Sequence, residues 1–229
     1  MAIDWDFIAQ KGIEGESEHL TGYVPELGSG FTVGSVDIGQ HSREDIRTIL
    51  QGYANVQAGG GRGSNIVGSI RKDLLTRLEP YTKEGRIGSV WEKYGSKEGY
   101  DMLAKTEEFK GEKGREDIEY IIKAKRYSFE DKLSNKKGWD NLDEKTQTIL
   151  GSVGWQYGTG KNKTTKRNIF EEFWKIRNDK TAIHEKLINM GKSEYTIRRG
   201  KEAGYIQPPP TAVQETLNVD KEKETFLSD

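Results

Sequence analysis

The sequence contains no cysteine, which excludes disulfide bonds and any chemistry that depends on a thiolate. Histidine is nearly as scarce, with three residues, so we expect neither a His-rich metal site nor a cofactor. Neither charge is in excess, because 36 Lys and Arg face 37 Asp and Glu. Whole-chain charge therefore directs the protein toward neither nucleic acid nor a membrane surface, and we expect no nucleic-acid partner.

The chain also lacks an apolar run of the length that spans a membrane, so we expect no membrane insertion. Its first seven residues include two aspartates and no basic residue, and no long apolar run follows them, which argues against a secretory signal peptide. We therefore expect synthesis in the cytoplasm. A substrate outside the cytoplasm would require release or delivery of the protein by another factor.

A chain of 229 residues is long enough to bury a hydrophobic core, so we do not expect disorder throughout. Near the start, apolar residues at helical spacing predict a short helix that Asp4 caps and that ends at Glu14. The next stretch, 21–40, combines glycines with aromatic and β-branched residues. This composition predicts a small hairpin or three-stranded sheet.

The remaining pattern is mostly helical. Ser42 and Asp45 form a capping-box pattern, and the clearest amphipathic face covers 66–78. Further helices are predicted at 87–94, 115–133, 146–157, 169–174 and 183–190. Three basic residues interrupt the apolar pattern of 115–133: Lys123, Lys125 and Arg126. The order predicts an α+β protein with a small Gly-rich sheet lobe, about 15–41, and a larger all-helical lobe, about 42–206.

Glycoside hydrolysis requires a protonated carboxylic acid on one side of the scissile bond and a second polar group, usually a carboxylate, on the other, and the sequence offers candidates for these groups. Glu14 ends a helix, where the carbonyl dipoles and nearby Glu16 and Glu18 are expected to raise its pKa, as a general acid requires. Thr32 and Asp37 lie in the Gly-rich segment, where small residues allow a polysaccharide to approach the backbone. A cleft is expected between the first helix and this sheet.

Two sets of short motifs stand out in the chain. The N-terminal motifs are Ile13-Glu-Gly15, Gly22-Tyr-Val-Pro25, Gly30-Phe-Thr-Val-Gly34 and Asp37-Ile-Gly-Gln40. The C-terminal motifs are Thr146-Gln-Thr-Ile-Leu-Gly-Ser-Val-Gly-Trp-Gln-Tyr-Gly158, Tyr195-Thr-Ile-Arg-Arg199 and Glu202-Ala203. Together they resemble the phage-type lysozymes and the pesticin-like toxin domains, which are peptidoglycan-cleaving muramidases. The resemblance spans roughly residues 3–206, although 53–140 match only as unspecific helices.

The resemblance implies one lysozyme-like catalytic domain over 1–206, with the active-site cleft between its lobes. The prolines at 208–210 and the polar residues after them predict a Pro-led polar tail over 207–229. It implies that Glu14 is the general acid, that Thr32 holds the attacking water and that Asp37 assists the attack. Glu26 is an alternative to Asp37. The interval from Thr32 to Asp37 is one residue shorter than in the family. On a regular strand this shift turns Asp37 to the other face, so we expect a bulge or a strand end to restore its direction.

The implied reaction is hydrolysis of the β-1,4 bond between N-acetylmuramic acid and N-acetylglucosamine, which lyses bacterial walls. An inverting outcome predicts about 6.5 to 9.5 Å between Glu14 and the second carboxylate. The expected partners are peptidoglycan glycan strands, with an immunity protein or a delivery machinery as further partners. Phage endolysin, virion lysozyme and secreted toxin all stay open as settings. The alternatives are a chitosanase-like or chitinase-like glycosidase and a non-catalytic module that binds the wall or has a structural role.

Five further residues are predicted to bind substrate: Tyr23, Gly34, Gln40, Gln156 and Arg198. The spacing of Arg198 and Arg199 from Glu202 also favours an ion-pair network within one helix. Tyr157 is predicted to lie in the core. The basic segment 161–167 is either a contact for anionic peptide stems or a solvated loop.

Overall fold

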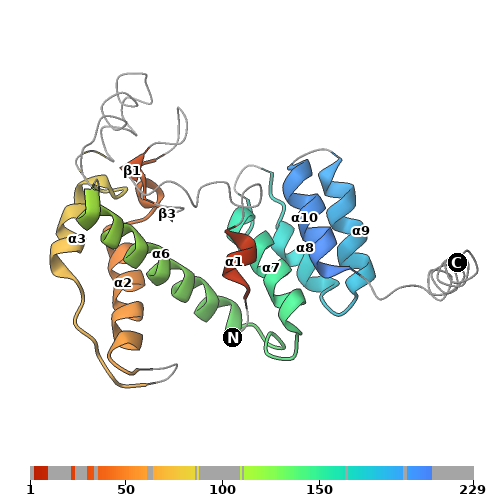
Figure 1. The fold of residues 1–229 in the computed structure, drawn as a ribbon, viewed down its shortest axis with the longest axis horizontal. Helices are drawn as coiled ribbons and strands as arrows, with labels where there is room; N and C mark the ends of the chain where they lie inside the picture. The colour runs from red at the N-terminus through yellow and green to blue at the C-terminus, as the bar shows by residue number, and fades with distance from the viewer. Residues whose placement is uncertain are drawn as a thin grey trace, which may run out of the picture. The chain divides into compact units, whose positions relative to one another are not determined.

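The computed structural model describes residues 3–9, 22–23, 30–33, 36–60, 64–85, 87, 109, 111–162, 165–192 and 195–207. Helices dominate these residues, and three short strands form one antiparallel sheet (Figure 1). The predicted class, a mostly helical α+β protein with a small sheet, is confirmed at this level. The chain divides into two compact units, Met1–Asp143 and Glu144–Asp229. Sheet and helices share the first unit, and the single catalytic domain over 1–206 stays a prediction.

Helix α1 covers Trp5–Ile8, and Asp4 caps it as predicted by accepting a hydrogen bond from Phe7 N at 2.8 Å. The predicted continuation of this helix to Glu14 lies outside the described residues. Trp5 attaches α1 to α6, the helix Gly111–Ser134. Its ring meets Phe129 edge-on, with 6.2 Å between centroids, and its indole N–H donates to Glu130.

The sheet contains β1 (Gly22–Tyr23), β2 (Thr32–Val33) and β3 (Val36–Asp37), in the order β1-β2-β3 with both pairs antiparallel. This confirms the three-stranded alternative predicted for 21–40. The 3-10 turn η1, Ile38–Gln40, follows β3 directly. The strands are only two residues long, and Val33, Val36 and Ile38 bury their side chains. The sheet therefore adds one small apolar layer to the unit.

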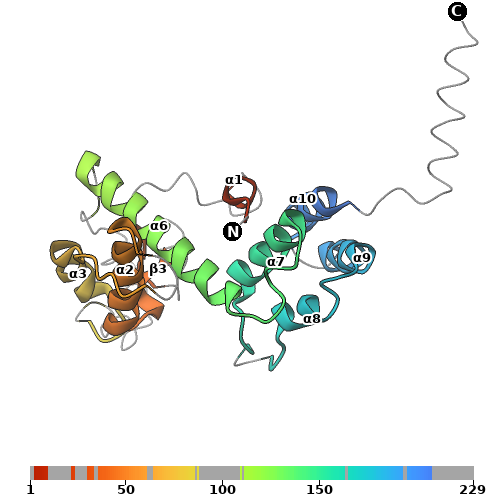
Figure 2. The ribbon, with the colours of Figure 1, turned by 90° about the horizontal axis from the view of Figure 1, so that it is seen from below.

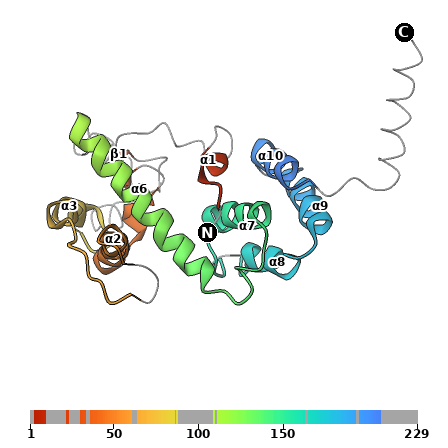
Figure 3. The ribbon, with the colours of Figure 1, turned by 60° about the horizontal axis from the view of Figure 1, so that its bottom comes forward.

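Helix α2, Arg43–Gln57, leads out of the sheet, and the predicted capping box is present because Ser42 and Asp45 bond each other's backbone N–H at 3.0 Å. Helix α6 packs against both α2 and β3, and Figure 3 shows it beside α2. The core that these elements enclose includes Phe31, Ile46, Leu50, Leu74, Leu78, Tyr81, Ile118 and Ile121. The strand that carries Asp37 is thus supported by the longest helix of the unit.

The helix predicted over 66–78 is wrong in its first half, because α3 covers only Lys72–Leu78. Gly68 approaches α2 so closely that a Cβ there would lie 2.0 Å from the Ala54 carbonyl oxygen. The side chains of Gln51 and Asn55 bond the Gly68 carbonyl and N–H at 2.7 and 3.0 Å. These side-chain bonds replace the backbone bonds of a helix. Pro80 lies in the 3-10 turn η2, Glu79–Tyr81, which ends α3 as predicted.

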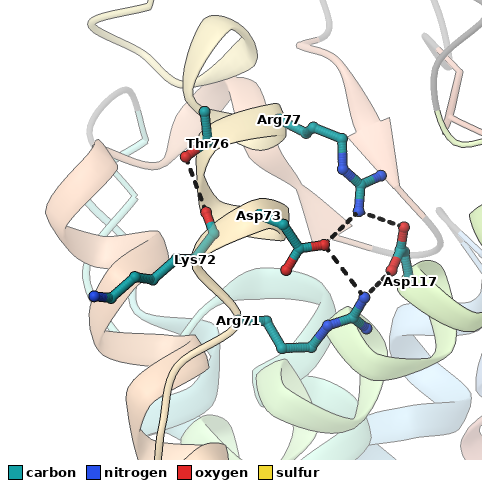
Figure 4. Close-up of polar contacts among 6 residues, drawn as sticks. All are labelled: Arg71, Lys72, Asp73, Thr76, Arg77 and Asp117. Carbon is teal, nitrogen blue, oxygen red and sulfur yellow. Dashed lines mark hydrogen bonds and ion pairs between the residues drawn. The ribbon is translucent and has the colours of Figure 1, made fainter.

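A buried carboxylate joins α3 to α6. Asp117 is fully buried and accepts hydrogen bonds from Arg71 at 2.5 Å and from Arg77 at 2.6 Å (Figure 4). Asp73 completes the network from the exposed side, at 3.7 and 3.4 Å from the same two guanidinium groups. Because both arginines come from or adjoin α3, this network fixes α3 against α6.

The second unit contains α7 (Glu144–Tyr157), α8 (Ile169–Lys175), α9 (Lys180–Gly191) and α10 (Thr196–Ile206). Helices α9 and α10 lie side by side, and α7 contacts α8 and α10 (Figures 1 and 2). Nine consecutive residues of α7, Thr146–Gly154, are buried, so α7 is the central helix of this unit. The helices predicted at 146–157, 169–174 and 183–190 are confirmed. Of the helix predicted at 87–94, only Ile87 is described, in helical conformation.

The predicted ion pairs within the last helix are present and buried. Glu202 is fully buried and pairs with Arg198 at 3.2 Å and with Arg199. Ser152 donates to the same carboxylate at 2.5 Å, and Arg199 donates to Gln156 at 2.5 Å. The network therefore connects α10 to α7.

Within the ranges given above, none of the helices combines the length and the apolar character that crossing a membrane demands.

Candidate functional site

Thr32 and Asp37 are direct cross-strand partners in the β2–β3 pair. Directly opposed residues on antiparallel strands project from the same face of the sheet, about 4.5 to 5.5 Å apart at Cβ. From the sequence we expect either a bulge or a strand end between Thr32 and Asp37. The structure has a strand end there. Strand β2 ends at Val33, and the chain returns antiparallel from Val36, so the alternation of one continuous strand does not apply.

Two glycines let η1 fold back onto the segment before β2. A Cβ on Gly39 would lie 2.7 Å from Gly30 Cα, and a Cβ on Gly30 would lie 2.5 Å from Asp37 Oδ1. Ile38 N donates to Phe31 O at 2.8 Å and fixes this arrangement. The Asp37 carboxylate therefore lies directly against the Gly30 backbone, at a position that only glycine leaves open.

Asp37 is half-buried, and burial raises the pKa of its carboxyl above the ordinary value. Hydrogen bonds from Gln40 and Gly39 and the positive charge of Lys125 act in the opposite direction. The bond from Gln40 N to Asp37 Oδ1 measures 3.2 Å and caps η1. With the net pKa raised, Asp37 is a stronger base than a solvated aspartate.

Thr32 is buried, and its hydroxyl donates to Gly30 O at 3.3 Å. Since the hydroxyl proton is used in this bond, the lone pairs of Thr32 Oγ1 remain to accept a bond from another donor. A water molecule bonded to Thr32 and to its cross-strand partner Asp37 would have both of its protons engaged, which would leave an oxygen lone pair free for attack.

The structure adds two residues that were not predicted from the sequence, His41 and Lys125. Lys125 Nζ of α6 lies 2.8 Å from Nε2 of His41, the residue that ends η1. A signal for Lys125 exists in the sequence, because it follows the buried Ile118 and Ile121 at helical spacing and so occupies the inward face of α6. His41 carries no such signal, because 84 residues separate it from its partner.

Both of these side chains have strongly lowered pKa values. Burial and the charge of Lys125 lower the pKa of His41 to about 4, against the opposing influence of Asp45. Burial and the charge of Lys132 lower the pKa of Lys125 to about 8, while Asp45 and Asp37 oppose this shift. At neutral pH the pair therefore consists of a neutral imidazole and an ammonium group.

Several predicted site residues lie outside the described part of the chain: Glu14, Glu26 and Gly34. Tyr23 is described only by its backbone in β1, where it pairs with Thr32. Gln40 is exposed beside Asp37. The cleft between the two lobes and the carboxylate separation of about 6.5 to 9.5 Å stay predictions, because Glu14 is not described.

Two predicted substrate-binding residues lie in the second unit and contact other side chains there. The Arg198 guanidinium is buried and donates to Ser152 O at 3.0 Å as well as to Glu202. Gln156 is half-buried and accepts the bond from Arg199. Tyr157, predicted to lie in the core, is half-buried, and the Arg199 guanidinium lies 5.4 Å from its ring centroid. Substrate contacts for Arg198 and Gln156 stay predictions.

Segment 161–167 is exposed where it is described. Asn162 closes the segment, since its N–H donates to Arg167 O at 2.7 Å and its side chain accepts from Thr165 N at 2.8 Å. Arg167 pairs with Glu172 at 3.1 Å, and hydrogen bonds from Arg167 and Lys186 lower the pKa of Glu172 to about 2. These contacts fit the solvated-loop alternative.

Among the residues that the structure describes, no three His, Asp or Glu side chains gather as a metal site would require. No protein family, curated protein or solved structure matches the chain. The resemblance to phage-type lysozymes therefore rests on the sequence motifs alone.

Proposed function

We propose that this protein is a muramidase of lysozyme-like fold that hydrolyses the β-1,4 bond between N-acetylmuramic acid and N-acetylglucosamine. Glu14 protonates the leaving oxygen, and Asp37 removes a proton from the water that attacks the anomeric carbon. The substrate is the glycan strand of peptidoglycan. The protein acts on the bacterial wall after its release or delivery from the cell that makes it.

The direct pairing of Thr32 with Asp37 across β2 and β3 carries the proposal. A hydroxyl with free lone pairs and a carboxylate of raised pKa share one face of the sheet, next to two glycines without side chains. A carboxylate that acts as general base is the group that an inverting glycosidase needs on the water side of the sugar, and the hydroxyl would help to hold that water. Thr32 and Asp37 follow Glu14 in the same order as the matching motifs of the family, which supports Glu14 as the general acid.

The reaction balances with these groups. Glu14 gives its proton to the glycosidic oxygen as the bond to the anomeric carbon breaks, and the water oxygen bonds that carbon from the opposite face. Asp37 takes one water proton while Thr32 Oγ1 accepts a hydrogen bond from the other. Because water enters opposite the leaving group, the released N-acetylmuramic acid has inverted configuration.

A substitution at Asp37 tests the proposal. Asp37→Asn keeps the acceptor for Gln40 N but removes the base, so release of labelled fragments from purified walls should fall about 100-fold or more. The control is Asp140→Asn, an exposed aspartate outside the site, which should keep wild-type activity. Near-normal release by Asp37→Asn with unchanged circular dichroism would overturn the role of Asp37 and leave Glu26 as the second carboxylate.

Two outcomes with the wild-type protein would favour the other functions. Cleavage of chitosan or chitin in preference to walls would make the protein a glycosidase of another amino sugar. Retention on walls without release of fragments would make it a wall-binding module.

A further inference from the structure

The contact between Lys125 and His41 joins α6 to the turn that carries Asp37. Asp37 begins η1 as its N-terminal cap, and His41 ends the same three-residue turn. The turn is fixed by the bond from Ile38 N to Phe31 O, and the Ile38 side chain is fully buried beneath it. Lys125 is therefore tied, through the 2.8 Å contact with His41, to the element that positions the Asp37 carboxylate.

The direction of this hydrogen bond follows from the chemistry of its groups. An ammonium group has three donors and no acceptor, so Lys125 donates and His41 Nε2 accepts. The neutral ring then carries its proton on Nδ1. Because His41 is neutral and Lys125 is charged at neutral pH, the pair presents one positive charge held by a polar, uncharged neighbour.

We propose that Lys125 is a positioning residue for the catalytic base, and that its ammonium group, held by His41, keeps the Asp37 carboxylate ionised and in place against Gly30. The role deepens the proposed muramidase function and rests on it. Burial of a carboxyl group favours its neutral form, whereas a nearby cation favours the ionised form that a base requires. Without Lys125, Asp37 stays protonated to a higher pH.

The groups around the pair come from four elements. Asp37 is faced by Gln40 and the Gly39 N–H from η1 and by Lys125 from α6. Lys125 is faced by His41, by Asp45 at the start of α2, by Lys132 on its own helix and by Asp37 from β3. Asp45 and Asp37 favour the charged form of Lys125, and Lys132 disfavours it, so the ammonium group is the cation shared by both carboxylates.

Titration of the full-length protein followed by carbon NMR of the Asp37 carboxyl group tests this role directly. In Lys125→Met, the midpoint of Asp37 should rise above the wild-type midpoint, and in Lys125→Arg it should stay near it. The matched control is Lys123→Met, which removes an exposed lysine of the same helix that pairs with Glu119 instead, and it should leave the Asp37 midpoint unchanged. An unchanged midpoint in folded Lys125→Met would overturn the proposal.

The wild-type protein offers a second test that does not depend on a variant that folds. The Asp37 carboxyl resonance should show a second, smaller inflection near pH 8, where Lys125 loses its proton. The absence of that inflection, in a protein whose Lys125 is seen to titrate there, would contradict the coupling.

Activity distinguishes the positioning role from the proposed function. The acid limb of the pH profile of wall cleavage should move to higher pH in Lys125→Met, with at least about a 3-fold loss of kcat/KM on that limb and rescue by Lys125→Arg. If the wild-type protein cleaves no wall while the Asp37 midpoint responds to Lys125→Met, the muramidase function fails and the electrostatic coupling stands. If the wild-type protein cleaves walls and the acid limb of Lys125→Met does not move, the positioning role fails alone.

Discussion

His41 makes the stability of the protein depend on pH. The folded state holds its ring neutral with a pKa of about 4, whereas the unfolded chain protonates it near 6.5. Between these values the unfolded state binds more protons, so the free energy of unfolding should fall as the pH drops from 6.5 to 4. The contribution of this one group is about 2 kcal/mol.

Urea unfolding at pH 7.5 and at pH 4.5 measures this effect. Acidification should lower the free energy of unfolding of both the wild type and His41→Gln. The loss should be about 2 kcal/mol smaller in His41→Gln, because glutamine binds no proton. Equal losses in the two proteins would show that the His41 ring is not held neutral in the folded state.

Burial also disfavours the charged form of Asp37, but this form is populated at neutral pH and not at acid pH. Its pKa is raised by burial, so its ionised form is less stable in the folded state than in water. The free energy of unfolding of Asp37→Asn at pH 7 should therefore be at least as high as that of the wild type, while wall cleavage is lost. Chemical denaturation checks this, and a marked loss of stability would indicate a structural role for the carboxylate.

At the scale of elements, Asp117 is the group that fixes α3 against α6. Asp117→Asn leaves two arginines without their buried carboxylate and should lower the free energy of unfolding by about 3 kcal/mol. Asp73→Asn removes a carboxylate that is 55% exposed in the same network and should change stability by less than about 1 kcal/mol. If urea denaturation shows equal losses of stability for Asp117→Asn and Asp73→Asn, the buried carboxylate does not contribute more than the exposed one, contrary to this expectation.

Gly68 is required for a close backbone approach, whereas Gly200 has room for a side chain. Gly68→Ala forces a Cβ into the backbone at the end of α2 and should destabilise the protein by about 2 kcal/mol. Gly200 lies in α10 with open space at its Cβ position, so Gly200→Ala should stabilise the protein by about 0.5 to 1 kcal/mol. Thermal denaturation of the two variants should give shifts of opposite sign, and shifts of the same sign would contradict this distinction.

Some of these elements could be predicted from the sequence and others could not. The capping box at Ser42 and Asp45 and the long helices were predictable, because each depends on residues within a few positions of one another. The segment 64–70 was not, since its apolar spacing is helical but the backbone N–H and carbonyl of Gly68 bond to side chains of α2. Likewise the Thr32–Asp37 pair follows from local order, whereas the contact between His41 and Lys125 depends on how α6 packs.

At the scale of the whole molecule, the two compact units each have a buried charged network, around Asp117 in the first and around Glu202 in the second. Asp37, the proposed base, and Lys125, its proposed positioning residue, both belong to the first unit. The central claim is that the molecule cleaves peptidoglycan as a muramidase with Glu14 as its acid. Glu14 is followed in sequence by the sheet that carries Thr32 and Asp37.

Mass spectrometry of the fragments released from purified walls tests this claim most directly. The wild-type protein should release muropeptides that end in reducing N-acetylmuramic acid. Glu14→Gln, folded as judged by circular dichroism, should release fewer of them by a factor of about 100 or more. Fragments that end in reducing N-acetylglucosamine, or equal release by Glu14→Gln, would contradict the account.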